Sequence, residues 1–549
     1  MAAPTKDQTT QDDRAMAGRT VRDATFDLLR RRELTTIFSN PGSTEVPFLT
    51  GLPADIRFVL GLHEGSLVSM ASGYALARRR PAFVLLHTTA GLGNAVNAIS
   101  TARVNRTPLV IAVGQQDRRH LALEPFLAGR LEGLAGSYPV WFDQPVRPQD
   151  VPGALERAYH EATTRRGPAI VVVPMDDWLA PAGEAHELAA PDRLLRPAAS
   201  DESAVAELAD LIATADSPAI VAGAGVDTAE SWAALTALAE RLACPVWQEP
   251  FGGQAGFPQD HHLFAGHLPI DRTRLRDTLA GHDLVLAVGA PVFRQYTYEP
   301  GPLVVEGTRL AVVTEEPDEA HRSPADLAVL GSPAAICTGI ANRLPARADR
   351  RQPSFERPDP TPAPRPGEPL RAGHVLSALA ERVPRDVVLV EECPSNRPEL
   401  ERRIPAREPL GFVSAAMGGL GYGLSAAIGL RMGLPQRPVL AVLGDGSALF
   451  GIHGLWSAAH YRVGVLFVIL KNGGYRVMDQ LAALQGGEAV WPSFEEIDIA
   501  GISRSLGCPA LRVEAHEELL RALDEVLPGL ADREGPLLLE VVVEPSANP

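Results

Sequence analysis

The chain has 549 residues, of which 45% are hydrophobic, and its formal net charge at pH 7 is −16. This length is typical of about three domains with large buried cores. The acidic balance argues against a protein that binds nucleic acid, because such proteins carry a basic face for the phosphate backbone. We therefore expect no nucleic-acid partner.

The sequence gives no sign of export or of membrane insertion. The first twenty residues are polar and carry both charge signs, and no apolar run reaches the roughly 18 residues of a membrane span. The four cysteines lie far apart, without a C-x-x-C pair or metal-ligand spacing: Cys244, Cys337, Cys393 and Cys508. We expect reduced thiols in a cytoplasmic protein that has no membrane partner.

Short β-branched runs alternate with Ala- and Leu-rich stretches along the chain. In chain order the runs are PAFVLLH (81–87), PLVIAVG (108–114), PAIVVVP (168–174), PAIVAGAG (218–225), DLVLAVG (283–289), RLAVVT (309–314), VVLVEE (387–392), VLAVLG (439–444), LFVIL (466–470) and LLLEVVV (537–543). This alternation is typical of parallel sheets covered by helices on both faces. The predicted fold class is α/β, with three doubly wound parallel-sheet domains.

Two polar, Pro-rich passages near 181–200 and 345–370 interrupt the alternation and have the composition of linkers. They divide the chain into domains at 1–190, 197–345 and 371–549. Residues 81–113 also align without a gap to 438–470, each reading as strand, glycine-containing turn, helix and strand. The similarity is one of pattern, which any two strand–helix–strand units can show, but we interpret it as an internal repeat.

A Gly-Asp-Gly-Ser segment follows one buried run, and Lys-Asn-Gly-Gly follows the next, with about one helix between them. Asp445 and Asn472 should therefore emerge at the carboxyl ends of neighbouring strands, where α/β sheets bind ligands. A carboxylate and an amide are hard oxygen ligands suited to Mg²⁺ bound together with phosphate oxygens. Gly446 would let the backbone approach a diphosphate, Ser447 offers a hydroxyl, and a helix N-terminus nearby favours the anion.

This GDG-x25-N spacing resembles the signature of the thiamine diphosphate-dependent decarboxylase family, in its benzoylformate decarboxylase branch. The resemblance extends over NPGSTEVPFL (40–49), LHEGSLVSMASGYALA (62–77), LLHTTAGLGNA (85–95), PLVIAVGQQ (108–116), APVFRQYTYEPG (290–301) and GGLGYGLSAAIG (418–429). It implies a subunit with a pyrimidine-binding domain, a central nucleotide-fold-like domain and a diphosphate-binding domain, and it implies thiamine diphosphate and Mg²⁺ as cofactors.

The resemblance assigns cofactor-binding roles residue by residue. Glu64 matches the carboxylate that hydrogen-bonds the aminopyrimidine ring, although taken alone it is also a typical first-turn carboxylate favoured by the helix dipole. Leu420 matches the aliphatic wedge that bends the cofactor, and the carbonyl of Gly418 would bind its exocyclic amine. Ser395 matches a phosphate contact, but Pro394 stands where a hydroxyl residue is usual.

The remaining cofactor and metal positions follow from the same motifs. Gly474, which stands where threonine is usual, is expected to bind the metal with Asp445 and Asn472 through its backbone carbonyl, and Lys471 replaces the commoner asparagine without preventing metal binding. The other cofactor-binding residues that the motifs imply are Asn40, Pro41, Gly42 and Tyr475.

Substrate-handling residues are assigned in the same way. Ser43 matches the serine that holds the substrate carboxylate, or it is a capping hydroxyl in a Pro-Gly turn. His87 matches a proton-shuttling histidine, a role that suits imidazole near neutral pH, or it is a buried strand-end histidine. Tyr296 stands where the family has a second histidine, and a phenol is a poorer proton shuttle at pH 7.

The pocket itself is expected on the helix that follows the metal site. Val477, Met478 and Leu481 should line it, and Leu481 replaces a residue of aromatic character. We therefore expect a substrate shaped differently from benzoylformate.

A Gly-x-Gly at 223–225 also follows a strand, which invites a dinucleotide interpretation. It lacks the third glycine and a clear acidic residue about twenty positions later, so we treat the middle domain as a scaffold.

The sequence as a whole predicts non-oxidative decarboxylation of a small-molecule 2-oxo acid to an aldehyde. Two alternatives stay open, a thiamine diphosphate-dependent carboligase and a cofactor-binding protein with little turnover. Because Glu64 and Asp445 lie in different domains, the resemblance implies a homodimer or homotetramer whose sites are shared between subunits.

Overall fold

The computed structural model describes residues 18–183, 190–191, 193–195, 201–347 and 355–544. The described residues form three six-stranded sheets, and the strands paired within each sheet run parallel. The predicted α/β class with three parallel-sheet domains is confirmed. The described parts of the two predicted linkers hold no helix or strand; their other residues lie outside the described ranges, and the predicted domain boundaries stay predictions.

The first sheet has the strand order β2-β1-β3-β4-β6-β5. Its strands are β1 (Thr36–Asn40), β2 (Arg57–Leu60), β3 (Ala82–Leu86), β4 (Leu109–Gln115), β5 (Trp141–Asp143) and β6 (Pro168–Pro174). Its helices are α2 (Val21–Arg31), α3 (Val46–Leu49), α4 (Glu64–Arg78), α5 (Thr88–Val104) and α6 (Val151–Arg165), with short 3-10 turns at η1 (Leu121–Leu123), η2 (Pro148–Asp150) and η3 (Asp177–Leu179).

The middle sheet has the order β12-β11-β10-β7-β8-β9. Its strands are β7 (Pro218–Ala222), β8 (Val246–Gln248), β9 (Phe264–His267), β10 (Leu284–Val288), β11 (Arg309–Thr314) and β12 (Leu327–Leu330). Its helices are α7 (Glu202–Ala213), η5 (Ala224–Val226), α8 (Ala229–Leu242), α9 (Arg272–Leu279), α10 (Pro317–Arg322) and α11 (Pro333–Arg343).

The third sheet has the order β14-β13-β15-β16-β18-β17. Its strands are β13 (Val388–Glu392), β14 (Phe412–Ser414), β15 (Val439–Gly444), β16 (Val465–Lys471), β17 (Ala510–Val513) and β18 (Leu537–Val542). Its helices are α12 (Ala372–Ala380), α13 (Arg397–Arg403), α14 (Tyr422–Gly433), α15 (Asp445–Gly451), α16 (Gly454–His460), α17 (Arg476–Leu484), α18 (Ile499–Ser505), α19 (His516–Val526) and η6 (Leu527–Asp532).

The first and third sheets have the same topology. Numbered from the first strand of each domain, both read 2-1-3-4-6-5, and the predicted repeat superposes β3 and β4 on β15 and β16. This agreement supports the internal repeat. The prediction of one helix between β15 and β16 is wrong in detail, because that connection forms two short helices, α15 and α16.

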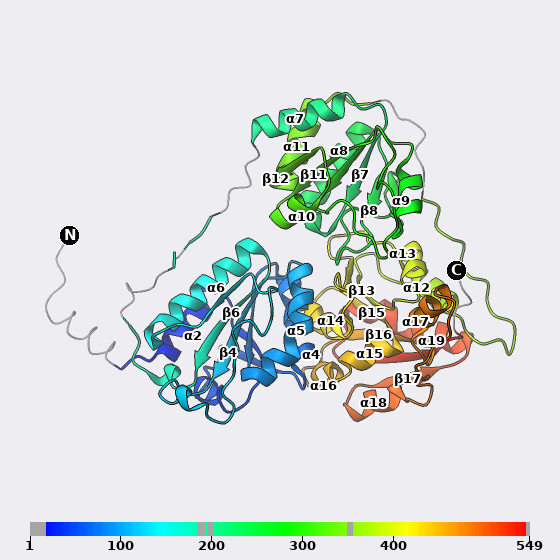
Figure 1. Cartoon of the computed structure of the whole chain (residues 1–549). Helices are drawn as coiled ribbons and strands as arrows, with labels where there is room; N and C mark the ends of the chain where they lie inside the picture. Colours follow the sequence, from blue (N-terminus) through cyan, green and yellow to red (C-terminus); the bar gives the residue numbers. More distant parts are fainter. Residues whose placement is uncertain (1–17, 184–189, 192, 196–200, 348–354, 545–549) are drawn as a thin grey trace.

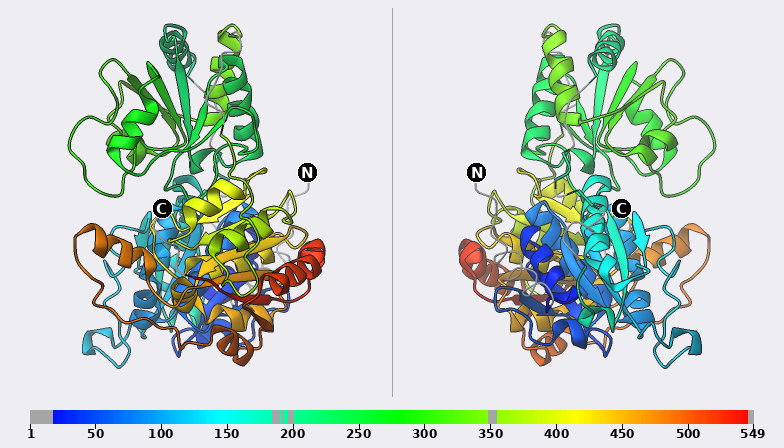
Figure 2. Two further views of the ribbon diagram at one scale, coloured as in Figure 1. Left: turned by 90° about the vertical axis from the view of Figure 1, so that its right-hand side faces the viewer. Right: turned by 90° about the vertical axis from the view of Figure 1, so that its left-hand side faces the viewer.

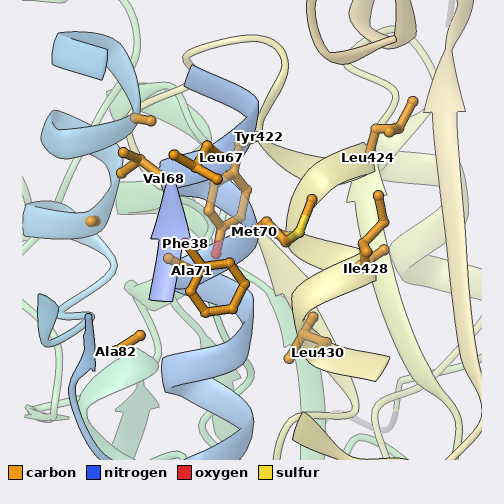
Figure 3. Packing of buried hydrophobic residues seen from close by; sticks show 14 of the residues in the cluster. Phe38, Leu67, Val68, Met70, Ala71, Ala82, Tyr422, Leu424, Ile428 and Leu430 are labelled. Atoms are coloured by element: carbon orange, nitrogen blue, oxygen red, sulfur yellow. The ribbon is translucent and has the colours of Figure 1, made fainter. Parts of the chain in front are cut away.

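The first and third domains pack against each other, and the middle domain lies beside the pair (Figures 1 and 2). A single buried cluster contains Phe38, Leu67 and Met70 of the first domain together with Tyr422 and Ile428 of the third (Figure 3). Helices α4 and α14 face each other across it. These two helices also begin at the carboxyl ends of their sheets, so their packing sets the relative position of the two candidate half-sites.

All four cysteines are buried free thiols, as predicted. Burial raises the pKa of the Cys244 and Cys337 thiols to about 12. None of the described helices combines the length and the apolar character that crossing a bilayer requires.

Candidate active site

The first half of the candidate site lies at the carboxyl edge of the first sheet. Asn40 ends β1, Glu64 begins α4 shortly after β2, and His87 follows β3 directly. Glu64 is buried, and its two carboxylate oxygens accept hydrogen bonds from the Nδ2 atoms of Asn40, at 3.1 Å, and Asn94, at 3.0 Å. The structure thus brings Asn40 and Glu64 together. Asn94, in the second turn of α5, was not predicted as a site residue.

His87 caps the start of α5 and lies against the NPGSTE segment. Its Nδ1 atom is 2.9 Å from Oε2 of Glu45, which is completely buried. Gly42 must be a glycine here, because a Cβ atom at this position would lie 2.5 Å from the imidazole ring. Ser43 is exposed in the same turn as Pro41. Sequence reasoning missed Glu45, although it belongs to a motif that was recognised.

The second half lies at the carboxyl edge of the third sheet and centres on Asp445, the first residue of α15. Its Oδ1 accepts the N–H of Gly446 at 2.8 Å, and its Oδ2 accepts the N–H groups of Asn472 at 3.0 Å and Gly473 at 2.7 Å. Burial raises the pKa of this carboxyl, and the three N–H donors counteract the shift. The predicted pair of Asp445 and Asn472 is therefore in direct contact, just after the ends of the neighbouring strands β15 and β16.

The neighbouring loop residues also gather there. Oδ1 of Asn472 accepts the N–H of Gly474 at 3.2 Å, and Ser447 is buried in the first turn of α15. A Cβ atom at Gly446 would lie 2.7 Å from the ring of Tyr475, so this glycine is required for close packing. Among the described residues, no group of three or more His, Cys, Asp or Glu side chains could hold a metal ion. A metal here would depend on one carboxylate with amide and carbonyl oxygens.

The loop that carries Gly418 and Leu420 is held by a buried carboxylate. Glu392, at the end of β13, accepts the N–H of Gly421 at 2.6 Å and that of Gly423 at the start of α14. Burial raises the pKa of Glu392 to about 8, although these N–H donors act to lower it. Gly418 and Gly421 adopt φ of +69° and +90°, which favour glycine. Leu420 is half-buried.

Pro394 and Lys471, two departures from the family pattern, differ in their exposure. Ser395 is half-buried directly after β13, and Pro394 beside it is exposed. Lys471 is buried and its Nζ lies 3.2 Å from Oε1 of Glu540 on β18, the strand next to β16. Its charge is therefore paired within the sheet.

The predicted pocket residues are half-buried or exposed in the chain. Helix α17, which carries Val477, Met478 and Leu481, has no buried residue, and Met478 is 43% exposed. Tyr296 lies in the middle-domain loop after β10 and is 60% exposed. Neither set contacts His87 through a hydrogen bond among the described residues.

A hydrogen bond connects α5 of the first half-site to the loop of the third domain that carries Leu420. Asn97 of α5 donates to the carbonyl oxygen of Leu420 at 3.2 Å, one turn after Asn94 binds Glu64. In the described part of the chain, no hydrogen bond or ion pair joins Glu64 to Asp445.

The middle domain has the strand order of dinucleotide-binding folds, but both glycines of its Gly-x-Gly loop pack closely against the residues that follow β10. A Cβ atom at Gly225 would lie 2.7 Å from Cα of Gly289, and one at Gly223 would lie 2.5 Å from Cβ of Ala290. At the same edge, Arg106 of the first domain forms an ion pair with Glu319. These contacts fit the predicted scaffold role.

Comparison with known proteins agrees with this division of the site. Residues 19–133 match the model of the thiamine pyrophosphate enzyme N-terminal TPP-binding domain, residues 205–340 that of the central domain, and residues 398–541 that of the C-terminal TPP-binding domain. The chain is 40% identical to benzoylformate decarboxylase from Pseudomonas aeruginosa over 532 residues, which cover 95% of this chain and 98% of that protein.

Two solved structures are similar over nearly the whole chain. The thiamine diphosphate-dependent 4-hydroxybenzoylformate decarboxylase of Rhodococcus jostii RHA1 has a TM-score of 0.91 and 35% identity, covering 96% of this chain and 100% of that one. Benzoylformate decarboxylase from Polynucleobacter necessarius has a TM-score of 0.92 and 34% identity, covering 97% and 100%.

Proposed function

The chain belongs to the thiamine pyrophosphate enzyme family, and we propose that it decarboxylates a 2-oxo acid to an aldehyde. The observation that carries this proposal is the arrangement at the first sheet. A buried carboxylate, Glu64, and a histidine held by a second buried carboxylate, His87, lie at the same sheet edge. The identity to benzoylformate decarboxylase supports the same reaction class.

The residues at the third sheet fit thiamine diphosphate and a divalent cation. Asp445, Asn472 and the carbonyl of Gly474 are hard oxygen donors of the kind Mg²⁺ prefers, and the described residues offer no competing cluster of His or Cys ligands. Gly446, Ser447 and Ser395 would receive the diphosphate. We propose that Leu420 supports the bend between the two rings and that the Gly418 carbonyl accepts from the exocyclic amine.

When bound, the cofactor supplies a carbon nucleophile and an electron sink for the loss of CO₂. The protein's own residues place and protonate the reacting groups. Glu64 would hydrogen-bond the pyrimidine ring, next to Asn40, Pro41 and Gly42, and Ser43 would orient the substrate carboxylate. His87 would deliver, through its Nε2 atom, the proton that takes the place of CO₂ on the former carbonyl carbon.

We also propose that the working site is shared between subunits. Glu64 belongs to the first domain and Asp445 to the third, yet one cofactor must contact both. Pairing the first domain of one subunit with the third domain of another across a two-fold axis solves this, as a homodimer or a homotetramer. The buried free thiols are in keeping with a cytoplasmic protein.

The proposed pocket favours a substrate other than benzoylformate. Leu481 replaces an aromatic residue of the family pattern, and it lies with Val477 and Met478 on a helix without buried residues. An aliphatic wall of this kind accepts an acid of different shape.

Product analysis with a panel of aliphatic and aromatic 2-oxo acids tests the function. Aldehyde and CO₂ formed in equal amounts, dependent on thiamine diphosphate, are expected. The panel should be repeated with an acceptor aldehyde, because carboligation would then consume the aldehyde and form a 2-hydroxy ketone. Binding of the cofactor without turnover of any acid would contradict the proposal and favour a low-turnover binding protein.

Carboligation is the second candidate, and one residue favours it. Tyr296 occupies the place of a second family histidine, and a phenol donates a proton poorly at neutral pH. Slower protonation leaves more time for attack on a second carbonyl.

A further inference from the structure

We propose that Glu45 is a positioning residue for the reaction, which fixes the tautomer and the orientation of His87. The inference rests on the proposed function, in which His87 moves protons on the substrate. Glu45 does not take part in that transfer itself. It acts only through the imidazole ring.

The geometry defines which ring nitrogen is available. Nδ1 of His87 lies 2.9 Å from Oε2 of Glu45 and 3.0 Å from Oγ1 of Thr44. A carboxylate can only accept, so the Nδ1 atom carries the proton of this hydrogen bond. Nε2 has no hydrogen-bond partner among the described residues, and the His87 side chain is 15% exposed. Nε2 is therefore the atom left to exchange a proton with substrate.

Hydrogen bonds hold both oxygens of the Glu45 carboxylate in place. It is fully buried, Oε2 also accepts the N–H of Gly42 at 2.7 Å, and Oε1 accepts the hydroxyl of Thr44. A side chain at Gly114, which lies on β4, would overlap both Oε1 of Glu45 and Oγ1 of Thr44. Two glycines, Gly42 and Gly114, thus make room for the ring and the carboxylate. The surrounding backbone therefore leaves space for His87 and Glu45.

The charge of Glu45 has one partner. Among the described residues, His87 is the sole basic group in an ion-pair contact with this carboxylate. A buried carboxylate without a fixed cation is costly, and a proton on the facing imidazole relieves that cost. Glu45 therefore stabilises the doubly protonated ring that forms whenever Nε2 accepts a proton. Glu45 does not contact the substrate itself, and it contributes only by holding the histidine that does.

Glu45→Gln tests the assignment with almost no change of shape. The amide can still accept from Gly42, but it offers Nδ1 a neutral partner that can also act as a donor, so the tautomer is no longer fixed. We expect kcat to fall by about 10- to 100-fold, at or below the lower end of general acid–base effects because the histidine itself remains, while KM and the affinity for thiamine diphosphate stay within about twofold.

A double-mutant cycle separates positioning from a general structural effect. In a His87→Ala background, Glu45→Gln should change kcat by less than about twofold, because the ring it orients is gone. Glu156→Gln is the matched control, since Glu156 is equally buried in the first domain but pairs with Arg31 and Arg32 away from the site. This control should keep the wild-type kcat.

Unchanged kcat in a folded Glu45→Gln enzyme, or an equal loss with and without His87, would overturn the assignment. If Glu45→Gln does not fold, Glu45→Asp serves instead, since it keeps the charge but retracts it from the ring, and its kcat should again fall only when His87 is present. A wild-type enzyme that turns over no 2-oxo acid would overturn the proposed function and this inference together, whereas the other outcomes concern Glu45 alone.

Discussion

Gly73 in α4 and Ala426 in α14 bring the backbones of the first and third domains into contact. A Cβ atom at Gly73 would overlap the carbonyl oxygen of Ala426, and one at Gly429 would overlap the carbonyl oxygen of Met70. The two contacts are reciprocal, because a glycine of each helix faces a backbone carbonyl of the other. The two helices therefore pack backbone against backbone at these glycines.

Gly73→Ala and Gly429→Ala should each destabilise this packing. A methyl group forced between two helix backbones must push them apart, which typically costs about 1–3 kcal/mol of unfolding free energy. Denaturant unfolding measures the loss. Gly529→Ala is the control, because nothing lies within 4 Å of a Cβ atom there and the change should stay within about 0.5 kcal/mol. Equal stability of all three variants would contradict the close contact.

Removal of the metal should release the cofactor. If Asp445 and Asn472 bind Mg²⁺, a chelator should abolish both activity and thiamine diphosphate binding, since the diphosphate loses its main charge partner. Asp445→Ala should do the same, measured by calorimetry or equilibrium dialysis. Asp524→Ala, on the exposed surface of the third domain, should bind normally. Tight cofactor binding by Asp445→Ala would count decisively against the metal assignment.

Two inactive variants should restore activity together if the site is shared. Glu64→Ala and Asp445→Ala are mixed, mildly dissociated and reassociated. In a mixed dimer, one site contains both substitutions and the other site contains neither. Up to about half of the sites in mixed dimers should therefore be active. Mass analysis verifies subunit exchange. Verified exchange without any returning activity would mean that both residues act within one chain.

The pH dependence of stability should depend on Asp227 of the middle domain. This carboxyl accepts the N–H of Leu410 at 3.0 Å, and burial raises its pKa to about 7. An acid whose pKa is raised on folding favours the folded state while it is protonated, below its ordinary pKa of 3.8, and that contribution is lost as pH rises through about 7.

Asp227→Asn removes this titration but keeps an oxygen acceptor. The variant should therefore gain unfolding free energy relative to the wild type between about pH 4 and pH 7, with a constant difference above pH 7 and at most about 4 kcal/mol in total. Urea unfolding over this pH range is the measurement. A difference that does not change with pH would show that the carboxyl is ionised in the folded protein throughout.

Tyr296→His should change the partition between products. If Tyr296 reaches the bound intermediate in the assembled enzyme, an imidazole there supplies an acid that works near neutral pH. Aldehyde release should then rise relative to 2-hydroxy ketone formation, measured with an acceptor aldehyde present. Tyr298→His, two residues along the same exposed loop, is the control. An unchanged partition in a folded variant would mean that Tyr296 does not contact the intermediate.

Most central strands could be predicted from the sequence because burial on both faces requires an unbroken apolar run, whereas the short central strands β1 and β8 were not among the named runs. All ten named runs are strands in the structure. Edge strands could not be predicted in this way. β12 alternates half-buried with exposed residues, β5 is only half-buried along its three residues, and most of β17 is exposed or half-exposed. Such strands are determined by a neighbour that offers hydrogen bonds, and that neighbour is fixed by the tertiary structure.

The candidate site was likewise predictable from the sequence only in part. Asp445 and Asn472 were predictable because each directly follows a buried apolar strand, and parallel neighbours end at one edge. The contacts of Glu45 with His87 and of Asn94 with Glu64 join residues 42 and 30 positions apart, on different loops and helices. A hydrogen bond needs its two atoms within about 3 Å, and periodicity does not fix positions that finely. The sequence by itself determined which sheet edges carry the chemistry, and side-chain packing decided which groups meet there.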